Sequence, residues 1–590
     1  MKLSISHDPR SDGQGDGAIA EPLYVLKFGG SVLRAIEDLP AVAGELYRQR
    51  RAGRRIVAVV SALAGETDRL FAEAALVAGA VSCRGVPDLV SLGEERTAAL
   101  LRLACDLIGL PAEICRAEEL GLRTEGEPLE SHPAGLDHSA IEAKLAATGL
   151  VIVPGFVGIG ANGQRSLLGR GGSDFSAVFL GGELGADRVR LYKDVDGVFD
   201  RDPARDADAR RFTHISWEDA LEVARPLIQP QSVVYAAGKA LPIEVEAIGS
   251  SYPTCVGPVS SEARPLSPGR PLRLGVAGYG IVGQALAARL RHDPRFEIAA
   301  ILVRDPRRER AVPPPCSLTT DVGAFVSAKF DIFIDALSCD HTGAALCRTL
   351  LTRGIHVVSA SKRVISGHHG PLSQAAAASD AHLLYSATVG GGAPVLETVA
   401  RAAAQGPIGE IACILNGTVN FILDRLADGV PADVALREAR DCGFAEEDCE
   451  ADLNGADTAA KLRIVAREAF GIDETALDVT VERLDAEAFT RIGASGERWV
   501  QVARLKQQSG SLEASVRLRP LSAVDGLRPV SREWNFAVIT LIDGRTLSCS
   551  GRGAGGPATA EAIVADLYDI VRRRDQAAPG TEAPSRIAAS

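Results

Sequence analysis

The sequence has no uninterrupted apolar run long enough to cross a bilayer, so no membrane-spanning segment is expected. Its first twenty residues lack the apolar core of a signal peptide, which argues against secretion. The 11 cysteines are scattered, without a CxxC pair or a cysteine–histidine spacing that indicates zinc. This cysteine usage fits a reducing environment, and we therefore expect a cytoplasmic protein with no membrane partner.

Basic charge is also scarce. The 64 lysines and arginines are outnumbered by 76 aspartates and glutamates, which gives a formal net charge of −12. No cluster of basic residues is interleaved with aromatics, so a nucleic-acid partner is not expected. Hydrophobic residues make up 46% of the chain and charged residues 24%, which is typical of a soluble globular protein. At 590 residues the chain is too long for one core, and roughly three to five domains are expected.

The chain shows no internal repeat, but it has one clear break in composition. Residues 251–271 are rich in proline, serine and glycine and have no apolar period, which favours an extended linker. On each side of this segment an apolar run enters a glycine-rich turn: YVLKFGGS begins at Tyr24, and LRLGVAGYGIVG begins at Leu272. A strand followed by a glycine turn and a helix opens many nucleotide-binding α/β domains. We therefore expect two nucleotide-binding halves.

The turn KFGGS can serve a phosphoryl group. Its glycines, Gly29 and Gly30, allow backbone N–H groups to approach phosphate oxygens, and Lys27 can offset charge on a transferred group. Alone, this turn is as readily structural as functional. Further along, SLGEERTAALL places Glu94 near the start of an amphipathic helix. GRGGSD, over residues 169–174, sets an arginine beside glycines at a helix start, which suits a carboxylate or phosphate.

These segments, with LYKDVDGVFD from Leu191, resemble the aspartate kinase branch of the amino acid kinase family over residues 22–250. The resemblance implies a three-layer α/β/α domain that transfers phosphate from ATP, with Mg²⁺, to aspartate. Lys27 would stabilise the phosphoryl group in flight. Three residues would hold aspartate: Thr67, Glu94 and Arg170. The residues implied around ATP are Gly29, Gly30, Ser61, Asp174, Lys193, Asp194 and Phe199.

Departures from this family fall on the nucleotide side. Lys193 replaces a usual threonine, Ala204 a usual arginine, Pro226 a usual lysine and Gln229 a usual histidine. We hypothesise that Lys193 compensates for a lost cation by approaching the phosphates from the opposite wall. Two alternatives stay open from the sequence: a working kinase with a retuned nucleotide site, or a degenerate nucleotide-binding domain.

The second half opens with the G-x-G-x-x-G pattern of a dinucleotide fold, formed by Gly278, Gly280 and Gly283 between a strand and an amphipathic helix. The next strand ends without the acid that NAD enzymes place near the ribose hydroxyls. Arg304 could instead meet a 2′-phosphate, which favours NADP over a merely solvated basic turn. The expected cofactor-binding residues are Gly278, Gly280, Ile281, Val282, Gly283, Arg304, Ser338, Lys362 and Gly553.

The segments SASKRVIS, SATVGGGAPV, LNGTVNFIL and GFAEEDCEADLNGADTAAKL complete a resemblance to homoserine dehydrogenase over residues 272–575. Asp457 and Lys461 lie four apart on an expected helix and so share one face. By the resemblance, Lys362 and Lys461 handle the proton and polarise the carbonyl, and Asp457 orients the substrate or Lys461. The residues implied to bind the rest of the substrate are Gly417, Thr418, Glu446 and Asp452.

The resemblance also implies a monovalent cation, Na⁺ or K⁺, held by backbone carbonyls at Val389, Gly391 and Ala393. The family commonly has glutamate where this chain has Ser386. Its ANK segment reads ASK here, which keeps Lys362 and loses the amide beside it.

The expected fold class is α/β, an amino acid kinase fold followed by a Rossmann NADP-binding domain and an α+β substrate and dimerisation domain. The expected division is 1–20 disordered N-terminus, 21–250 kinase, 251–271 linker, 272–395 Rossmann domain, 396–545 substrate domain, 546–575 return segment to the Rossmann domain and 576–590 disordered tail.

The expected function is bifunctional: ATP-dependent phosphorylation of L-aspartate, and NADPH-dependent reduction of aspartate semialdehyde to homoserine. The alternatives are a homoserine dehydrogenase with a degenerate kinase domain, and a non-catalytic protein that binds both ligands. Both families commonly dimerise, so a homodimer or larger homo-oligomer is expected. The chain leaves no room for the paired ACT regulatory domains usual between such halves, so little inhibition by threonine or lysine is expected.

Overall fold

The computed structural model describes residues 19–79, 84–169, 171–225, 227–265, 269–308, 316–441, 449–472, 476–508, 511–524, 527, 534–553 and 555–577. Three residues singled out from the sequence, Arg170, Pro226 and Glu446, lie outside these ranges. Most of both chain ends that we expected to be disordered also lies outside them. Among the described residues, no helix combines the length and the apolar character that a membrane span requires.

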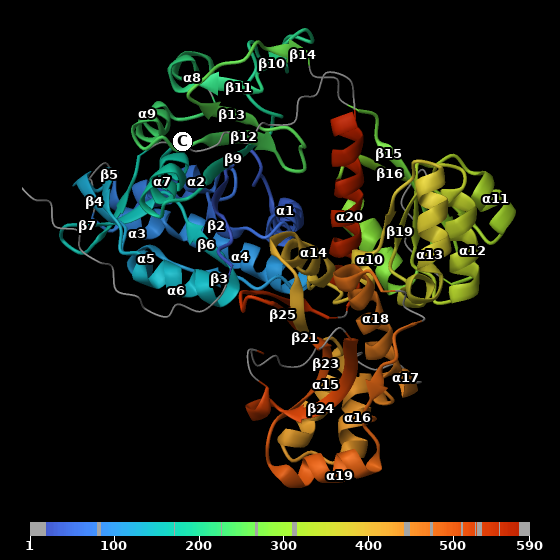
Figure 1. Ribbon diagram of the computed structural model, residues 1–590. Helices are drawn as coiled ribbons and strands as arrows, with labels where there is room; N and C mark the ends of the chain where they lie inside the picture. The colour runs from blue at the N-terminus through green and yellow to red at the C-terminus, as the bar shows by residue number, and fades with distance from the viewer. Residues whose placement is uncertain are drawn as a thin grey trace, which may run out of the picture.

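An eight-stranded sheet forms the centre of the first half, in the order β11-β13-β12-β9-β1-β2-β6-β3 (Figure 1). Its strands are β1 (Leu23–Phe28), β2 (Arg55–Val60), β3 (Glu113–Ile114), β6 (Leu150–Pro154), β9 (Arg188–Lys193), β11 (His214–Ser216), β12 (Ile243–Ala247) and β13 (Thr254–Gly257). Neighbouring strands run parallel except β12 and β13. Apolar runs such as RIVAVV in β2 are buried almost throughout, because helices cover both faces of a parallel sheet.

Helices pack on both faces of this sheet and make three layers. The helices are α1 (Leu39–Arg51), α2 (Glu66–Ala78), α3 (Val86–Val90), α4 (Leu92–Ile108), α5 (Ala117–Leu120), α6 (Ser139–Thr148), α7 (Gly172–Glu183), α8 (Trp217–Val223) and α9 (Pro230–Gly238), with a 3-10 turn η1 (Ile36–Asp38). Helices α1 and α4 share one hydrophobic cluster, whereas α6, α7 and α9 share another on the opposite face. The predicted α/β/α layering is therefore confirmed.

Two smaller sheets flank the first half. Their strands are β4 (Arg123–Glu127), β5 (Glu130–Gly135), β7 (Val157–Gly160) and β8 (Arg165–Leu167) in one sheet, and β10 (Arg210–Arg211) and β14 (Arg264–Pro265) in the other. Strands β13 and β14 both fall within the segment 251–271 that the composition indicated as a linker. Strand β13 pairs with β11 and β12, so the central sheet extends beyond residue 250 before the chain leaves it.

The second half begins with a six-stranded parallel sheet in the order β17-β16-β15-β18-β19-β20, which is that of a Rossmann domain. Its strands are β15 (Leu272–Ala277), β16 (Phe296–Leu302), β17 (Ser317–Thr319), β18 (Ile332–Asp335), β19 (His356–Ser359) and β20 (Leu383–Leu384). Its helices are α10 (Ile281–Leu290), α11 (Val322–Ser327), α12 (Asp340–Leu351) and α13 (Lys362–Ala378). The glycine turn between β15 and α10 lies where the sequence predicted it.

A second six-stranded sheet, in the order β22-β24-β23-β21-β25-β26, forms the α+β substrate domain. The strands are β21 (Ile408–Ile414), β22 (Thr480–Val481), β23 (Trp499–Gln508), β24 (Ser511–Pro520), β25 (Trp534–Leu541) and β26 (Thr546–Arg552). The helices are α14 (Val395–Gln405), α15 (Gly417–Ala427), α16 (Ala432–Asp441), α17 (Glu450–Leu453), α18 (Ala456–Phe470) and α19 (Ala486–Ser495), with 3-10 turns η2 (Ser386–Thr388) and η4 (Leu521–Ala523).

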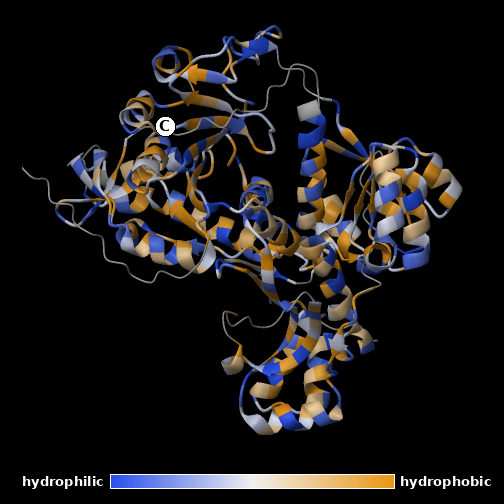
Figure 2. Cartoon of the chain, in the orientation of Figure 1, coloured by the Kyte–Doolittle hydropathy of each residue, from blue (hydrophilic) through white to orange (hydrophobic). Residues whose placement is uncertain are grey.

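Helix α20 (Gly556–Ala577) returns the chain to the Rossmann domain and also joins the two halves. It packs on α10 of the Rossmann domain and on α1 of the first half, between which it stands in Figure 1. One hydrophobic cluster runs without a break from Leu46 on α1 through Ile563 on α20 to Leu286 on α10. Apolar residues follow the sheets and the inner helix faces throughout the molecule (Figure 2). The two halves therefore share a core.

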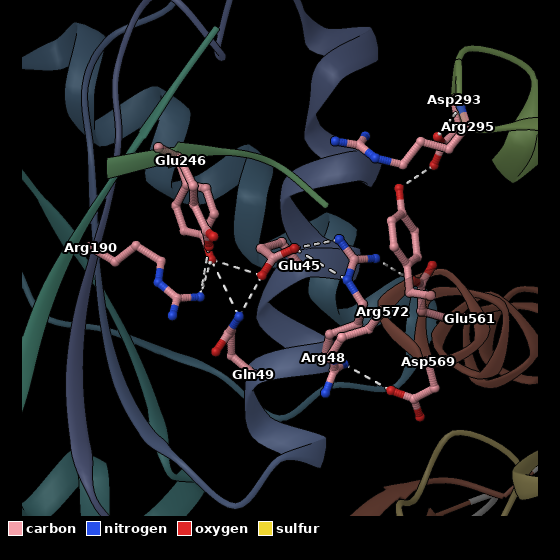
Figure 3. Close-up of polar contacts among 12 residues, drawn as sticks. Glu45, Arg48, Gln49, Arg190, Glu246, Asp293, Arg295, Glu561, Asp569 and Arg572 are labelled. Carbon is pink, nitrogen blue, oxygen red and sulfur yellow. Dashed lines mark hydrogen bonds and ion pairs between the residues drawn. The ribbon is translucent and has the colours of Figure 1, made fainter. Parts of the chain in front are cut away.

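Polar contacts cross the same interface (Figure 3). Arg48 on α1 forms an ion pair with Glu45 of its own helix and lies 3.9 Å from Glu561 on α20. Glu561 also pairs with Arg289 near the end of α10, at 2.7 Å. These buried charges are compensated by one another, as burial requires.

Candidate active sites

In the first half, two lysines meet one carboxylate at the ends of adjacent strands. Lys27 lies on β1 and Lys193 ends β9, and these strands are paired in the sheet. Asp174, in the first turn of α7, forms ion pairs with both lysines. Its Oδ1 lies 2.5 Å from the Nζ of Lys27, and its Oδ2 lies 2.9 Å from the Nζ of Lys193. Ligands bind beyond the carboxyl ends of strands in such sheets. The structure therefore brings together three residues implied for the phosphates.

This group carries a net positive charge. Burial lowers the pKa of Lys27 against the attraction of Asp174, and the nearby ammonium of Lys193 adds to the effect. Burial acts to raise the pKa of Asp174, but the two lysines hold it below its ordinary range. Two cations against one carboxylate leave a site that attracts an anion such as a polyphosphate.

Glu94 lies at the start of α4, as predicted, and is almost fully buried. One of its oxygens accepts a hydrogen bond from the backbone N–H of Ala62 at 3.3 Å. Within the described part of the chain the other oxygen has no hydrogen-bond partner. Burial raises the pKa of Glu94 to about 7. A buried acid with a spare oxygen suits a ligand ammonium. Thr67, in the first turn of α2, is half-buried.

The remaining residues implied around ATP surround the strand ends. Gly29 and Gly30 directly follow β1, and the backbone N–H of Ser61, just after β2, donates to the carbonyl of Phe28 at 3.0 Å. Asp194 is exposed just after β9, and Phe199 forms a β-bridge with Arg211. Among the departures, Ala204 is exposed, and Gln229 precedes α9 with its side chain near Gly171.

In the second half, a second lysine–acid–lysine group spans the two domains of that half. Lys362 is the first residue of α13 in the Rossmann domain, and Asp457 lies in the first turn of α18 in the substrate domain. Their side chains form an ion pair. The other oxygen of Asp457 lies 2.8 Å from the Nζ of Lys461, which also donates to the carbonyl of Leu415 at 2.8 Å. Burial opposes ionisation of Asp457, but the two lysines hold its pKa well below its usual range.

Polar residues at the start of α15 adjoin this group. Asn416 caps the helix by accepting from the N–H of Val419, and its amide donates to the carboxylate of Asp452 at 3.0 Å. Burial raises the pKa of Asp452, and the charge of Asp457 adds to this rise. Asp452 lies in the short helix α17. Gly417 and Thr418 begin α15 beside Asn416, as their place in the sequence requires.

The glycine turn of the Rossmann domain has the shape that a dinucleotide needs. Gly278 has φ of +92°, and a Cβ there would collide with the Ala336 carbonyl. A Cβ on Gly283 would collide with the Gly278 carbonyl, whereas no atom of the described residues lies within 4 Å of a Cβ on Gly280. The backbone is thus open at the N-terminus of α10, where a pyrophosphate can approach.

Other residues implied for the cofactor lie around this turn. Ile281 is exposed and Val282 half-buried at the start of α10, and Arg304 is exposed just after β16. Ser338 is exposed after β18. The residues present therefore fit a nicotinamide dinucleotide.

The residues implied for a monovalent cation line a turn between the Rossmann and substrate domains. Val389, Gly391 and Ala393 are buried there, and the Ala393 carbonyl accepts from the N–H of Val395. Gly391 packs against the carbonyl of Gly553. Asn535 donates to the Gly390 carbonyl at 3.3 Å. Its own amide oxygen is buried without a hydrogen-bond partner among the described residues.

An unpaired buried oxygen beside a carbonyl-lined turn fits a hard monovalent cation. The described residues hold no group of three or more histidine, cysteine or acidic side chains placed for a metal. A cation in this turn would therefore rest on carbonyl and amide oxygens. Sequence reasoning missed Asn535, since a lone asparagine in a strand gives no signal. It also missed Asn416, although an asparagine directly before Gly417 and Thr418 is a recognisable helix-capping signal.

The fold and the two lysine–acid–lysine groups define a fusion of two nucleotide-binding α/β modules. Residues 22–245 match the amino acid kinase family. Residues 278–386 match the NAD binding domain of homoserine dehydrogenase, and residues 394–568 match homoserine dehydrogenase. One chain therefore matches the amino acid kinase family over its first half and the two domains of homoserine dehydrogenase over its second half.

Curated relatives match the first half. The aspartokinase of Pseudomonas aeruginosa is 36% identical over 226 residues, which are 38% of this chain and 55% of that protein. Aspartokinase 2 of Bacillus subtilis is 34% identical over 226 residues, with the same coverage. The aspartokinase of Thermus thermophilus is 31% identical over 265 residues, 44% of this chain and 65% of that protein. This chain thus spans about half the length of the first two relatives.

Solved structures match the second half. A homoserine dehydrogenase from Thiobacillus denitrificans is 27% identical, with a TM-score of 0.47, and the match covers 52% of this chain and 76% of that one.

Proposed function

We propose that this chain is a bifunctional enzyme of the aspartate pathway. Its first half phosphorylates the side-chain carboxylate of L-aspartate with ATP, and its second half reduces aspartate semialdehyde to homoserine with NADPH. The observation that carries the proposal is the recurrence, in each half, of two lysines paired with one buried aspartate. The matched families and the aspartokinase relatives support the same assignment.

In the kinase half, Lys27 and Lys193 approach the transferred phosphoryl group from two neighbouring strands. Their charges stabilise the negative charge that spreads over the phosphoryl oxygens during transfer. Asp174 holds both ammonium groups in place before ATP arrives. Glu94 binds the aspartate ammonium with its spare oxygen, assisted by Thr67, and Arg170 is proposed for a substrate carboxylate. Mg²⁺ would accompany ATP, with Asp194 exposed beside β9 to meet it.

In the dehydrogenase half, the Rossmann turn binds NADP(H), which supplies the hydride for the aldehyde carbon. Lys461 is held at 2.8 Å by Asp457 and by the Leu415 carbonyl, so its ammonium has a fixed direction. We assign Lys461 and Lys362 to polarising the aldehyde oxygen and protonating the alkoxide that forms there. Asp457 orients both lysines. Asp452 and Glu446 are proposed for the substrate ammonium, with Asn416 fixing the Asp452 carboxylate.

The finer parts of the proposal rest on fewer residues. NADP is proposed over NAD because Arg304 follows β16. NAD enzymes commonly have at this place an acidic residue that binds the ribose hydroxyls. A Na⁺ or K⁺ ion is proposed at Val389, Gly391 and Ala393, with Asn535 as a further oxygen donor. A cytoplasmic location and a homodimer stay predictions from the sequence.

The proposal is tested with the purified full-length chain in two assays. Incubation with ATP, Mg²⁺, aspartate and hydroxylamine should yield aspartyl hydroxamate only when aspartate is present. Incubation with homoserine should reduce NADP faster than NAD at equal concentration. Homoserine oxidation without hydroxamate would instead support a dehydrogenase with a degenerate kinase domain, and the absence of both products would support a non-catalytic binding protein.

A further inference from the structure

The dehydrogenase half has a hinge that the kinase half touches. The chain crosses between the Rossmann and substrate domains twice, at residues 385–394 and at the described residues 552–553 and 555–556, and these two crossings form the hinge. The two crossings lie side by side, because the N–H of Gly392 donates to the carbonyl of Arg552 at 2.8 Å. Any change in the angle between the two domains must bend these segments.

Arg51, the last residue of kinase helix α1, reaches both sides of this hinge. Its Nη2 lies 2.7 Å from the hydroxyl of Ser386 at the first crossing and 2.9 Å from Glu397 on α14, just beyond it. The same nitrogen lies 2.5 Å from Asp566 on the return helix α20. Ser386 also donates to Asp566 through its hydroxyl, at 2.6 Å, and through its backbone N–H, at 3.1 Å.

The backbone of Arg51 is held as well as its side chain. Arg401 on α14 donates to the carbonyl of Arg51 at 2.6 Å, so α14 and the end of α1 hold each other. A second kinase helix, α4, ends against the hinge. The N–H of Arg552 donates to the carbonyl of Gly109 at 3.3 Å, and the Ile108 carbonyl lies against Gly392.

The Arg51 contacts are buried, and their geometry needs a guanidinium. The side chain of Arg51 is 9% exposed and that of Asp566 is fully buried. The other terminal nitrogen of Arg51, Nη1, lies 3.1 Å from Asp569 on α20. The two nitrogens of the planar fork thus serve a hydroxyl and three carboxylates together, whereas a lysine ammonium is a point charge on a shorter reach. Arg48, one turn earlier on the same face of α1, belongs to the neighbouring network of Glu45 and Glu561 (Figure 3).

We propose that Arg51 of the kinase half is a positioning residue for the dehydrogenase, which fixes the angle between its cofactor and substrate domains through Ser386, Glu397 and Asp566. This inference rests on the proposed dehydrogenase function. Lys362 and Asp457 meet across the same domain boundary, so the angle sets the distance from the hydride donor to the polarised aldehyde. Misplacement of reacting groups by about 1 Å can cost about a hundredfold in rate. Ser386, where the family commonly has glutamate, is one of the residues that Arg51 contacts.

The test uses the full-length chain with Arg51→Lys, Ser386→Ala and the double variant. Arg102→Lys is the matched control, because Arg102 lies on the kinase helix α4 and pairs at 3.2 Å with Asp106 of the same helix. Ser386→Ala removes one hydroxyl and leaves the buried ion pairs intact, so it serves if Arg51→Lys folds poorly. For each variant, homoserine oxidation, aspartyl hydroxamate formation and hydrogen exchange of the peptide 385–395 are measured.

We expect Arg51→Lys to lower the kcat of homoserine oxidation about tenfold while the KM for NADP changes less than twofold, because the Rossmann turn is untouched. Ser386→Ala should lower kcat about threefold, and the double variant should be no worse than Arg51→Lys alone. Exchange of peptide 385–395 should accelerate in all three, with hydroxamate formation unchanged and the control like wild type.

Unchanged kcat and unchanged exchange in both single variants would overturn the inference, as would losses that are equal in both activities. In either case the proposed function would still stand if the wild-type chain oxidises homoserine. If the wild type does not oxidise homoserine, the proposed function fails, and the exchange of peptide 385–395 alone decides whether Arg51 holds the hinge.

Discussion

The ammonium group of Lys193 lies 2.9 Å from the carboxylate of Asp174. Asp174 also pairs with Lys27. Lys193, which departs from the aspartate kinase pattern, therefore belongs to the same charged group as Lys27, which matches that pattern. This geometry favours the hypothesis of a compensating cation. It places a second positive charge beside the first, on the adjacent strand, at the carboxyl end of the sheet, where ligands bind in such folds.

Replacement of Lys193 by threonine should therefore weaken the use of ATP. We expect the KM for ATP in hydroxamate formation to rise about tenfold, since a charge-assisted contact contributes about 1.5–3 kcal/mol. The KM for aspartate should change little. Lys239→Thr is the matched control, because Lys239 pairs with Glu183 on an exposed face. Unchanged or improved ATP use in Lys193→Thr would show that Lys193 does not compensate.

Glu94 should make aspartate binding depend on pH. Its pKa is raised to about 7 by burial, and only the carboxylate attracts the substrate ammonium. The KM for aspartate should thus rise as the pH falls from 8 to 6. Glu94→Gln should have a high KM for aspartate that is flat across this window. A wild-type KM that stays constant between pH 6 and pH 8 would rule out this role.

The same raised pKa has a consequence for stability. Because the pKa of Glu94 is higher in the folded chain than in the unfolded chain, its ionisation disfavours folding. The cost grows as the pH rises from about 4.5 and is complete above about 7. Glu94→Gln should therefore raise Tm at pH 8 and change it little at pH 4.5, in thermal unfolding followed by circular dichroism.

Gly278→Ala should impair the dinucleotide turn. Alanine at φ of +92° is strained by about 1–3 kcal/mol, and its Cβ would meet the Ala336 carbonyl. We expect the Kd for NADPH, measured by fluorescence, to rise at least tenfold. Gly354→Ala is the control, because Gly354 also has positive φ (76°) and its nearest neighbour, the Ser379 carbonyl, is 3.6 Å from the added Cβ. Equal losses of NADPH affinity in both variants would indicate general destabilisation.

Local patterns in the sequence predicted the parts of both sites that follow from spacing. Asp457 and Lys461 are four residues apart, so any helix there places them on one face. The strand–glycine–helix openings likewise located Lys27 and Gly278. These features depend on a few neighbouring residues, which is why no structure was needed to find them.

Contacts between distant segments could not be predicted in this way. Nothing near Lys362 in the sequence indicates that it pairs with Asp457 from another domain. The same holds for Lys193 and Asp174, and for Arg51 and the hinge. Residues 251–271 were predicted to be a linker because a short strand without an apolar period gives no local sequence signal. Strand β13 in this segment is stabilised by pairing with β11 and β12, which the local sequence does not indicate.

If one chain carries two separable activities, a single variant in each half should remove one activity and spare the other. Lys27→Ala and Asp457→Asn are each assayed for aspartyl hydroxamate and for NADP reduction by homoserine. We predict that Lys27→Ala loses hydroxamate formation by at least a hundredfold and still oxidises homoserine, and that Asp457→Asn does the reverse. Hydroxamate formation that persists undiminished in Lys27→Ala, or that is absent from the wild-type protein, would contradict a bifunctional chain with Lys27 in the kinase site.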